Sequence, residues 1–466
     1  MALNSLPAAM FHGLRPASHP AAQLGVIVTA AFILYAGYVK LSRPRLPLPP
    51  GPRNSIFSSP PQSSPYPWIA YLEWKKTYGD LVYFKTMGYP MLVVNSYDAM
   101  VDLFDKRGDI YSSRPVRTMI RELSESDSTI FSPPWLTGNP GSASAGVVLT
   151  LAYGYEVADN QDEYVHLADE ALKSMGRAGL LGTYYVDYFP WLKHLPEWFP
   201  FTQFKRDAKI WRIPVRQVLH RPFDATKQRL KDGKASSCLV ADELEQVYAG
   251  LSSADEQTIR NTAATTFAGT PQRDIGNLFQ AHLPPWPTSR TLKGGHRKKL
   301  IAFFKTSICY ELLRWNPVTP LVLPRYATVE NEYRGYAIPR GTTMYANVWA
   351  ALHDERYPNP FEFKIDRFLD QAKNAQAGIN PLPDIVFGFG RRVCAGKELA
   401  FDFLWIAVAS LLASYDISKA VDENGYIIDA PIEYTPHLLS HPKEFRCSIR
   451  PRSPGAAASI EQTAYF

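Results

Sequence analysis

The sequence Phe387-Gly-Phe-Gly-Arg-Arg-Val-Cys-Ala-Gly396 holds one of the chain's four cysteines, Cys394, in a loop between Gly390 and Gly396. An apolar helical pattern, Lys397–Tyr415, follows the loop directly. The free amides and the positive dipole end at the start of a helix stabilise an anion, so a thiol placed there ionises and binds metal readily. We therefore expect Cys394 to be a metal ligand.

The residues around Cys394 indicate what kind of metal site this is. Gly390 and Gly396 allow the backbone to approach a flat ligand closely, Arg392 can face an anionic group on that ligand, and Phe387 offers an aromatic face. Zinc would need three or four ligands at close spacing, and no second Cys or His is near. Taken singly, a buried cysteine is more often a small apolar core residue. The loop as a whole fits a haem better than a zinc ion.

The loop completes the longer pattern Phe-x-x-Gly-x-Arg-x-Cys-x-Gly. This pattern is similar to the signature of the haem-thiolate monooxygenases, the cytochrome P-450 superfamily, in which a Cys thiolate holds the haem iron. The resemblance implies a fold that is mainly α with a smaller β-rich lobe, and heme b as the cofactor. It implies Cys394 as the iron ligand, with Phe387, Gly390, Arg392 and Gly396 around the cofactor.

Composition limits the other classes of function. The 466 residues are 46% apolar and carry a net charge of +6 without a long basic run, so the sequence gives little support to nucleic-acid binding. The four cysteines lie far apart, which predicts no disulfide framework and fits a reducing compartment. We find no internal repeat and expect a monomer.

The N-terminal region predicts a membrane anchor. After a tail of residues 1–20, Ala21–Val39 is an uncharged apolar run of about the length that spans a hydrocarbon core, and the basic residues behind it keep that side cytoplasmic. A basic, proline-rich linker follows at residues 40–60 and would be a stiff spacer. We expect residues 61–452 to form the haem domain and residues 453–466 a C-terminal tail. The resemblance implies a transmembrane helix in the endoplasmic reticulum membrane with a cytoplasmic body; a buried core helix is the alternative for the apolar run.

Periodicity predicts the elements of the body. The expected helices are Glu163–Ala178, Lys205–Lys231, Arg297–Trp315 and Lys397–Tyr415, and Asp255–Thr270 resembles part of a helix of the family. The expected strands are Leu81–Thr86, Met91–Asn95, Arg334–Ile338 and Thr342–Asn347. The aromatic- and proline-rich Tyr184–Phe204 resembles the cover of the family's substrate channel, and an aromatic piece of core is an equally good interpretation.

Two blocks typical of the family are missing. Its members carry a Trp-x-x-x-Arg helix that holds a haem propionate, whereas Val116–Gly146 is rich in Ser, Pro and Gly and has no such pair. The helix predicted before Pro271 resembles the first half of the helix on the distal face of the haem, which makes Ala268, Gly269 and Thr270 the candidate catalytic residues. The family continues with an acid–alcohol pair that relays protons, but here Pro271 ends the helix.

A second set of residues implies support for the cysteine loop. Glu311 and Arg314 lie at i, i+3 on one helix face and can pair, although such pairs are common and weak on a surface. The resemblance implies that they join Arg367 and lock the loop that holds the thiolate. It also implies that Arg325 contacts a haem propionate, at a position where the family often has a His.

Two functions therefore stay open. The first is a membrane-anchored, fungal microsomal type of monooxygenase that inserts one oxygen atom of dioxygen into a lipophilic small molecule, in secondary metabolism or xenobiotic oxidation. Its electrons would come from NADPH through a partner reductase in the lipid bilayer. The second is a truncated, catalytically impaired relative that folds poorly or binds haem without turnover. A peroxygenase or isomerase is a third option without a positive signal, and the substrate is not readable from the sequence.

Overall fold

The structure of the chain, a computed structural model, describes residues 46–52, 66–123, 142–157, 162–178, 184–268, 297–369, 383–429, 432–436, 438–440 and 442–463. The chain divides into two units, one formed by Met1–Leu48 with Glu332–Ala337 and the other by the remaining residues. In the first unit, the backbone N–H of Ala337 donates to the carbonyl of Pro47 at 2.9 Å.

The predicted anchor lies outside the described residues. Ala21–Val39 falls in residues 1–45, for which the structure gives no description. In the part of the chain that is described, no helix has both the length and the apolar character needed to cross a bilayer. The transmembrane helix therefore stays a prediction from the sequence.

A four-stranded sheet forms the β-rich lobe of the second unit. The hairpin of β1 (Leu81–Thr86) and β2 (Tyr89–Val94) is extended by β6 (Thr343–Ala346), parallel to β2, and then by β3 (Arg325–Tyr326), in the order β1-β2-β6-β3. Helix α2 (Pro67–Tyr78) packs on β1. Large apolar residues of these elements form one buried cluster: Trp68, Tyr71, Val82, Phe84, Met91, Val93 and Tyr345.

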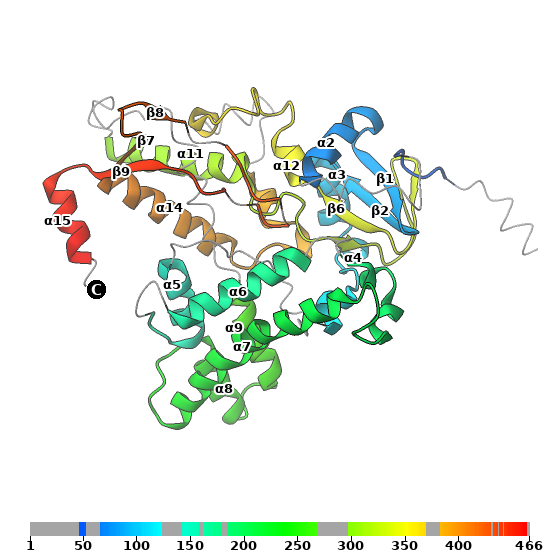
Figure 1. Cartoon of the computed structure of the whole chain (residues 1–466), viewed down its shortest axis with the longest axis horizontal. Helices are drawn as coiled ribbons and strands as arrows, with labels where there is room; N and C mark the ends of the chain where they lie inside the picture. The colour runs from blue at the N-terminus through cyan, green and yellow to red at the C-terminus, as the bar shows by residue number, and fades with distance from the viewer. Residues whose placement is uncertain are drawn as a thin grey trace, which may run out of the picture. The chain divides into compact units, whose positions relative to one another are not determined.

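Five helices pack together as one group (Figure 1). They are α5 (Ser142–Tyr153), α6 (Glu163–Ala178), α7 (Gln203–Lys231), α8 (Leu239–Tyr248) and α9 (Glu256–Ala268). Their apolar faces bury a shared core because helical spacing places apolar residues on one stripe of each helix.

A second group of helices carries the cysteine loop. Helix α14 (Lys397–Ser414) packs on α11 (Arg297–Trp315), on β7 (Tyr415–Val421) and on α15 (Pro454–Thr463), whereas α9 packs mainly on α5, α7 and α8. Although α14 is almost wholly apolar, Ile406 is 57% exposed on it. An apolar helix with exposed large side chains is incompletely covered.

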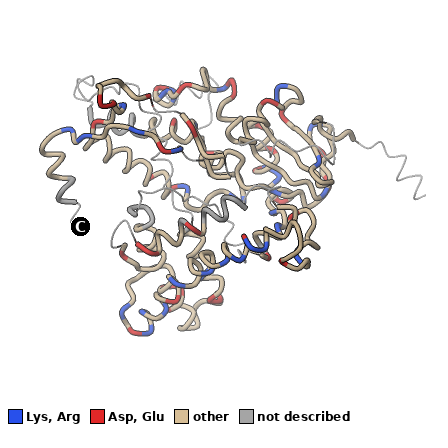
Figure 2. The backbone as a smooth tube through the Cα atoms, in the orientation of Figure 1, with Lys and Arg blue, Asp and Glu red and all other residues tan. Residues whose placement is uncertain are grey.

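The remaining elements are short. They are α3 (Tyr97–Met100), η2 (Val101–Lys106), α4 (Gly108–Tyr111), η3 (Met119–Leu123), η4 (Tyr185–Asp187), η5 (Pro190–His194), β4 (Asn331–Tyr333), β5 (Tyr336–Ile338), α12 (Val348–Leu352), η6 (Ile365–Phe368), η7 (Pro383–Phe387), η8 (Gly390–Arg392), β8 (Ile427–Ile428) and β9 (Cys447–Pro451). Among them, β4 pairs with β5, and β8 and β9 pair with β7 in a three-stranded sheet. Figure 2 shows basic and acidic residues interspersed along the described chain.

The helix-rich body with a small β lobe agrees with the sequence prediction, and the helices Glu163–Ala178 and Arg297–Trp315 have the predicted bounds. Two segments outside the predicted haem domain contact it. The predicted C-terminal tail contains α15, which packs on α14 and β9. Within the predicted linker, the Pro50 carbonyl accepts the Tyr83 N–H at 2.9 Å. A Cβ on Gly51 would lie only 1.8 Å from the Tyr83 carbonyl oxygen, so this close approach requires glycine.

Candidate active site

The cysteine loop is shaped by two glycines with left-handed backbone. Gly388 has φ +90° and Gly390 has φ +49°, and the loop closes where the Cys394 N–H donates to the Phe387 carbonyl at 2.8 Å. A Cβ on Gly390 would lie 3.0 Å from the Phe104 carbonyl oxygen. The close approach predicted for Gly390 is therefore made to the protein's own backbone, and the sequence analysis missed Gly388.

Gly396 has a different role from Gly390. It is the N-cap of α14 with φ −91°, a conformation open to other residues, and a Cβ there would meet only the Cys394 Sγ, at 3.9 Å. That contact is an ordinary van der Waals distance, so neither the space around Gly396 nor its backbone conformation requires glycine.

Gly390→Ala should destabilise the protein, because a side chain at positive φ costs about 1–2 kcal/mol and the added Cβ also meets the Phe104 backbone. The thermal unfolding midpoint measures the effect. Gly146→Ala is the matched control, since Gly146 lies inside α5 and its Cβ would make only ordinary contacts, at 3.6 Å, with Val157. Equal midpoints for the two variants would contradict the prediction.

The thiol of Cys394 is partly buried at the start of α14. Burial raises its pKa above the ordinary value, and the hydrogen bond from the Gly396 amide lowers it only in part. This corrects the expectation that the helix start by itself makes the thiol ionise readily. A bound cation would supply the missing charge, because a coordinating thiol is deprotonated outright. Within the described residues, no three His, Cys, Asp or Glu side chains group as a metal site, so Cys394 stands as a single-residue ligand candidate.

Arg325 is buried beside the cysteine loop. Its guanidinium donates to the carbonyls of Phe104 at 2.9 Å and Phe389 at 2.7 Å, and it lies over both aromatic rings. Burial, and then the charge of Arg392, lower its pKa to about 10, while Asp105 acts in the opposite direction. The structure thus places Arg325 next to the cysteine loop, and its predicted contact with a haem propionate stays a prediction.

Arg114 completes a cluster of three arginines with Arg325 and Arg392. It donates to the carbonyls of Leu323 at 2.7 Å and Pro324 at 2.9 Å. Burial, then the charges of Arg325 and Arg392, lower its pKa to about 9. Three guanidiniums that repel one another form a site suited to a ligand with more than one negative charge.

The sequence analysis missed Arg114. It lies in Tyr-Ser-Ser-Arg-Pro, residues 111–115, a stretch that resembles the family but lacks a motif that assigns the arginine a role. Arg392, which was predicted, extends its Nε to the Ser112 carbonyl at 3.1 Å, so it joins the same segment.

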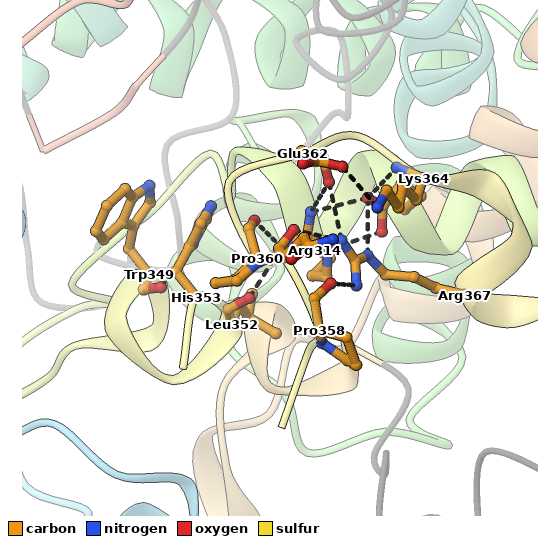
Figure 3. Close-up of polar contacts among 11 residues, drawn as sticks. Arg314, Trp349, Leu352, His353, Pro358, Pro360, Glu362, Lys364 and Arg367 are labelled. Atoms are coloured by element: carbon orange, nitrogen blue, oxygen red, sulfur yellow. Dashed lines mark hydrogen bonds and ion pairs between the residues drawn. The ribbon is translucent and has the colours of Figure 1, made fainter. Parts of the chain in front are cut away.

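Glu311, Arg314 and Arg367 come together in the interior of the protein. Figure 3 shows Arg314 and Arg367 beside the segment that they hold. Arg314 pairs with both carboxylate oxygens of Glu311, at 2.7 and 2.8 Å, and Arg367 Nε lies 3.3 Å from Glu311 Oε1. The side chains of Glu311 and Arg314 have no exposed surface. The pair is therefore not the weak surface ion pair that the sequence left possible.

The three charged residues hold one irregular segment, Pro358–Lys364. Arg314 and Arg367 donate to backbone carbonyls of this segment, and the Lys364 N–H donates to Glu311 Oε1 at 2.8 Å (Figure 3). The cysteine loop is reached indirectly, because α11 also packs on η7 and α14, which flank the loop. The role of these residues in locking the cysteine loop stays a prediction, and these contacts through α11 are the route by which they could support it.

His353 lies beside the Glu311 cluster, stacked on Trp349 with ring centroids 4.2 Å apart. Burial, and then the charge of Arg314, lower its pKa to about 3. In the unfolded chain the pKa of a His is about 6.5. Between about pH 6.5 and 3 the unfolded state therefore binds more protons than the folded state, and the free energy of unfolding falls as the pH falls.

We expect acidification from pH 6.5 to 5 to lower the free energy of unfolding by about 2 kcal/mol through His353. Denaturant titrations at both pH values measure it. His353→Gln should remove most of this pH dependence, whereas His220→Gln should leave it, because burial lowers the pKa of the less buried His220 less strongly. A pH dependence unchanged in His353→Gln would refute the assignment.

The predicted catalytic residues are only partly described. Ala268 is the last residue of α9, while Gly269 and Thr270 lie outside the described residues. The role of these three residues stays a prediction from the sequence.

Comparison with known proteins identifies similar chains. The sequence model of the family "Cytochrome P450", written here as P-450, matches residues 304–447, which include the Glu311 cluster and the cysteine loop. A cytochrome P-450 monooxygenase of Armillaria gallica is 33% identical over 95% of this chain and 99% of its own length. Cytochrome P-450 monooxygenase 98 of Postia placenta is 32% identical over 93% of this chain and 96% of its own. Tryptamine 4-monooxygenase of Psilocybe cyanescens is 29% identical over 93% of this chain and 98% of its own.

The alignments are longer than the part of this chain that they cover. The alignment with the Armillaria gallica protein has 519 positions, whereas 95% of 466 residues is about 443, so about 76 positions have no residue in this chain. With the Psilocybe cyanescens protein the alignment has 504 positions and 93% of the chain is about 433 residues, which leaves about 71. This chain therefore lacks internal residues that both relatives contain.

Proposed function

This chain belongs to the cytochrome P-450 family, fungal type, and we propose that it acts as a haem-dependent monooxygenase on a lipophilic small molecule. The observation that carries the proposal is the juxtaposition of Cys394, at the start of α14, with three arginines that together suit a multiply charged anion. A haem matches both parts of this site, because its iron can bind the thiolate and its two carboxylates can pair with the guanidiniums.

The chain's own residues divide the binding of haem among themselves. Cys394 Sγ would be the iron ligand, and Arg114, Arg325 and Arg392 would hold the carboxylates. Haem supplies the activation of dioxygen, with one atom going to the substrate and the other to water. The Gly396 amide stabilises the thiolate through its hydrogen bond, and the carbonyls of Phe104 and Phe389 keep the Arg325 guanidinium in place.

Electrons would come from outside the chain. The sequence has no Gly-x-Gly-x-x-Gly nucleotide loop of its own, so we infer that NADPH acts through a partner reductase. We also infer that Ala21–Val39 anchors the protein in the endoplasmic reticulum membrane, where a lipophilic substrate partitions. Secondary metabolism or xenobiotic oxidation would be the setting.

The second candidate is a relative that binds haem but turns over poorly. Its support is the absence of about 76 positions present in the Armillaria gallica protein, together with Pro271 where the acid–alcohol pair should follow. The exposed apolar side chains of α14 also support this second candidate, because the loss of a helix from the interior would leave such surface uncovered.

The reduced, carbon-monoxide-bound difference spectrum tests the proposal. With haem supplied during expression, we expect a red-shifted thiolate-type Soret band that disappears in Cys394→Ala, because alanine removes the only thiolate at the site. Cys447→Ala is the matched control, since Cys447 lies on β9 and its loss should leave the band unchanged. Absence of the thiolate band in the wild-type chain would refute the proposed function.

A further inference from the structure

A second buried ion pair lies outside the residues assigned so far. Arg117 donates from Nη2 to Asp187 Oδ2 at 2.8 Å and from Nε to the same oxygen at 3.1 Å. The side chains of Arg117 and Asp187 are 4% and 0% exposed. A pair this deeply buried is costly to desolvate, so it persists only where its geometry is well satisfied.

Asp187 also holds the backbone beside Arg117. Its other oxygen, Oδ1, accepts the Met119 N–H at 2.9 Å, so one carboxylate fixes two points of the segment Ser113–Leu123. Apolar packing surrounds this contact, through a cluster formed by Met119, Ile120, Val186, Phe204 and Ala208. Asp187 thereby joins this segment to η4, at the start of the aromatic-rich Tyr184–Phe204.

The other end of the same segment reaches the arginine cluster. The Ser113 carbonyl accepts the Tyr326 N–H at 3.0 Å, next to Arg325, and Arg114 donates to the carbonyls of Leu323 and Pro324. Residues 114–117 have no helical or strand hydrogen bonding of their own. Their position therefore depends on the contacts at their two ends.

Arg114 needs such a restraint. Its guanidinium is held near those of Arg325 and Arg392, and the repulsion among these cations favours moving Arg114, which sits on an irregular segment, away from the other two. The attachment of Arg117 to Asp187, three residues further along the chain, opposes that movement. Because Arg114 is then already restrained, it loses less conformational entropy when it binds an anion.

We propose that Asp187 is a positioning residue: by fixing Arg117 and Met119 it holds Arg114 in the arginine cluster, ready for the carboxylates of the cofactor. The inference rests on the proposed function in one respect, the identification of haem as the anion. The other half of the inference, that Asp187 restrains the backbone of Ser113–Leu123 and its contact with β3, does not depend on which anion binds.

Amide hydrogen exchange in the haem-free protein tests whether Asp187 restrains the backbone of this segment. Asp187→Asn should speed exchange across Ser113–Leu123 and at the Tyr326 amide by about tenfold or more, since it removes charge-assisted hydrogen bonds. Asp207→Asn is the matched control, because Asp207 lies in α7 and binds Tyr184 and Gln203. If exchange becomes faster only at residues 184–189 and at Met119, next to the substitution, the effect does not reach Arg114 and the proposal is refuted.

A titration with haem and with its dimethyl ester tests the link to the carboxylates. The ester cannot pair with Arg114, so the wild-type protein should bind haem more tightly than the ester, and Asp187→Asn should reduce that preference about tenfold. Asp187→Glu, which keeps the charge, should restore part of it. If Asp187→Asn weakens both ligands equally, Asp187 is only a stabilising residue and the proposal fails.

The outcomes separate this inference from the proposed function. A wild-type chain without a thiolate-type band refutes the proposed function, whereas a normal band with an unchanged haem-to-ester preference in Asp187→Asn refutes only the inference. If Asp187→Asn does not fold because the buried Arg117 loses this carboxylate, the double variant Arg117→Gln/Asp187→Asn, which removes both charges of the pair, carries both measurements. In the double variant, a reduced preference for haem over the ester supports the inference, and an unchanged preference refutes it.

Discussion

Glu311→Gln is expected to destabilise the native structure severely. The variant leaves Arg314, which has no exposed surface, and the buried Arg367 without their shared carboxylate. Breaking a buried ion pair in this way costs about 3–5 kcal/mol, a large part of a total stability of about 5–15 kcal/mol. The segment Pro358–Lys364 should lose its anchor at the same time, because its carbonyls are held by the two arginines.

Circular dichroism and haem incorporation measure the loss. Glu362→Gln is the matched control: the Glu362 side chain is 58% exposed in a pair with Lys364, and it serves the cluster only through its backbone carbonyl. We expect this variant to fold and to take up haem like the wild type. Similar unfolding midpoints for Glu311→Gln and Glu362→Gln would show that the cluster does not support the fold.

Restoring the missing residues should raise turnover by about a hundredfold to ten-thousandfold, the usual contribution of a positioned proton donor or acceptor. The change replaces residues 124–141, which leaves Arg117 and Met119 in place, and the residues after Ala268 up to Arg297 by the corresponding segments of the Armillaria gallica relative. The restored second segment should supply the acid–alcohol pair in place of Pro271, and a longer distal helix that can cover the exposed side of α14.

Product formation from NADPH with a fungal reductase measures this effect. Two controls separate its causes: a chain with only the first segment restored, and a fully restored chain in which the acid and alcohol are both alanine. We expect both to turn over slowly, the second despite normal haem binding. Equal turnover by the unmodified and the restored chain would show that the absent residues are not needed for catalysis.

Much of this protein could be predicted from local sequence. The spacing of Phe387, Gly390, Arg392, Cys394 and Gly396 indicated the cysteine loop and its family, and the 3.6-residue period predicted α11 and α14 within one residue of their ends. These features are encoded by neighbouring residues, so hydrogen bonds and apolar faces within one element suffice to specify them. The breaks in the family's pattern, within Val116–Gly146 and at Pro271, predict two missing blocks, and that assignment stays a prediction.

The tertiary structure decided what distant residues do together. The arginine cluster joins Arg114 and Arg325 to Arg392, and Asp187 reaches back to Arg117; no local period or motif links such positions. Whether an Arg is a solvated surface charge or a buried one beside two others depends on burial and on the charges that the fold brings near it. Sequence patterning specifies each element's conformation and buried face, whereas electrostatic fields and long-range contacts exist only once the elements have packed.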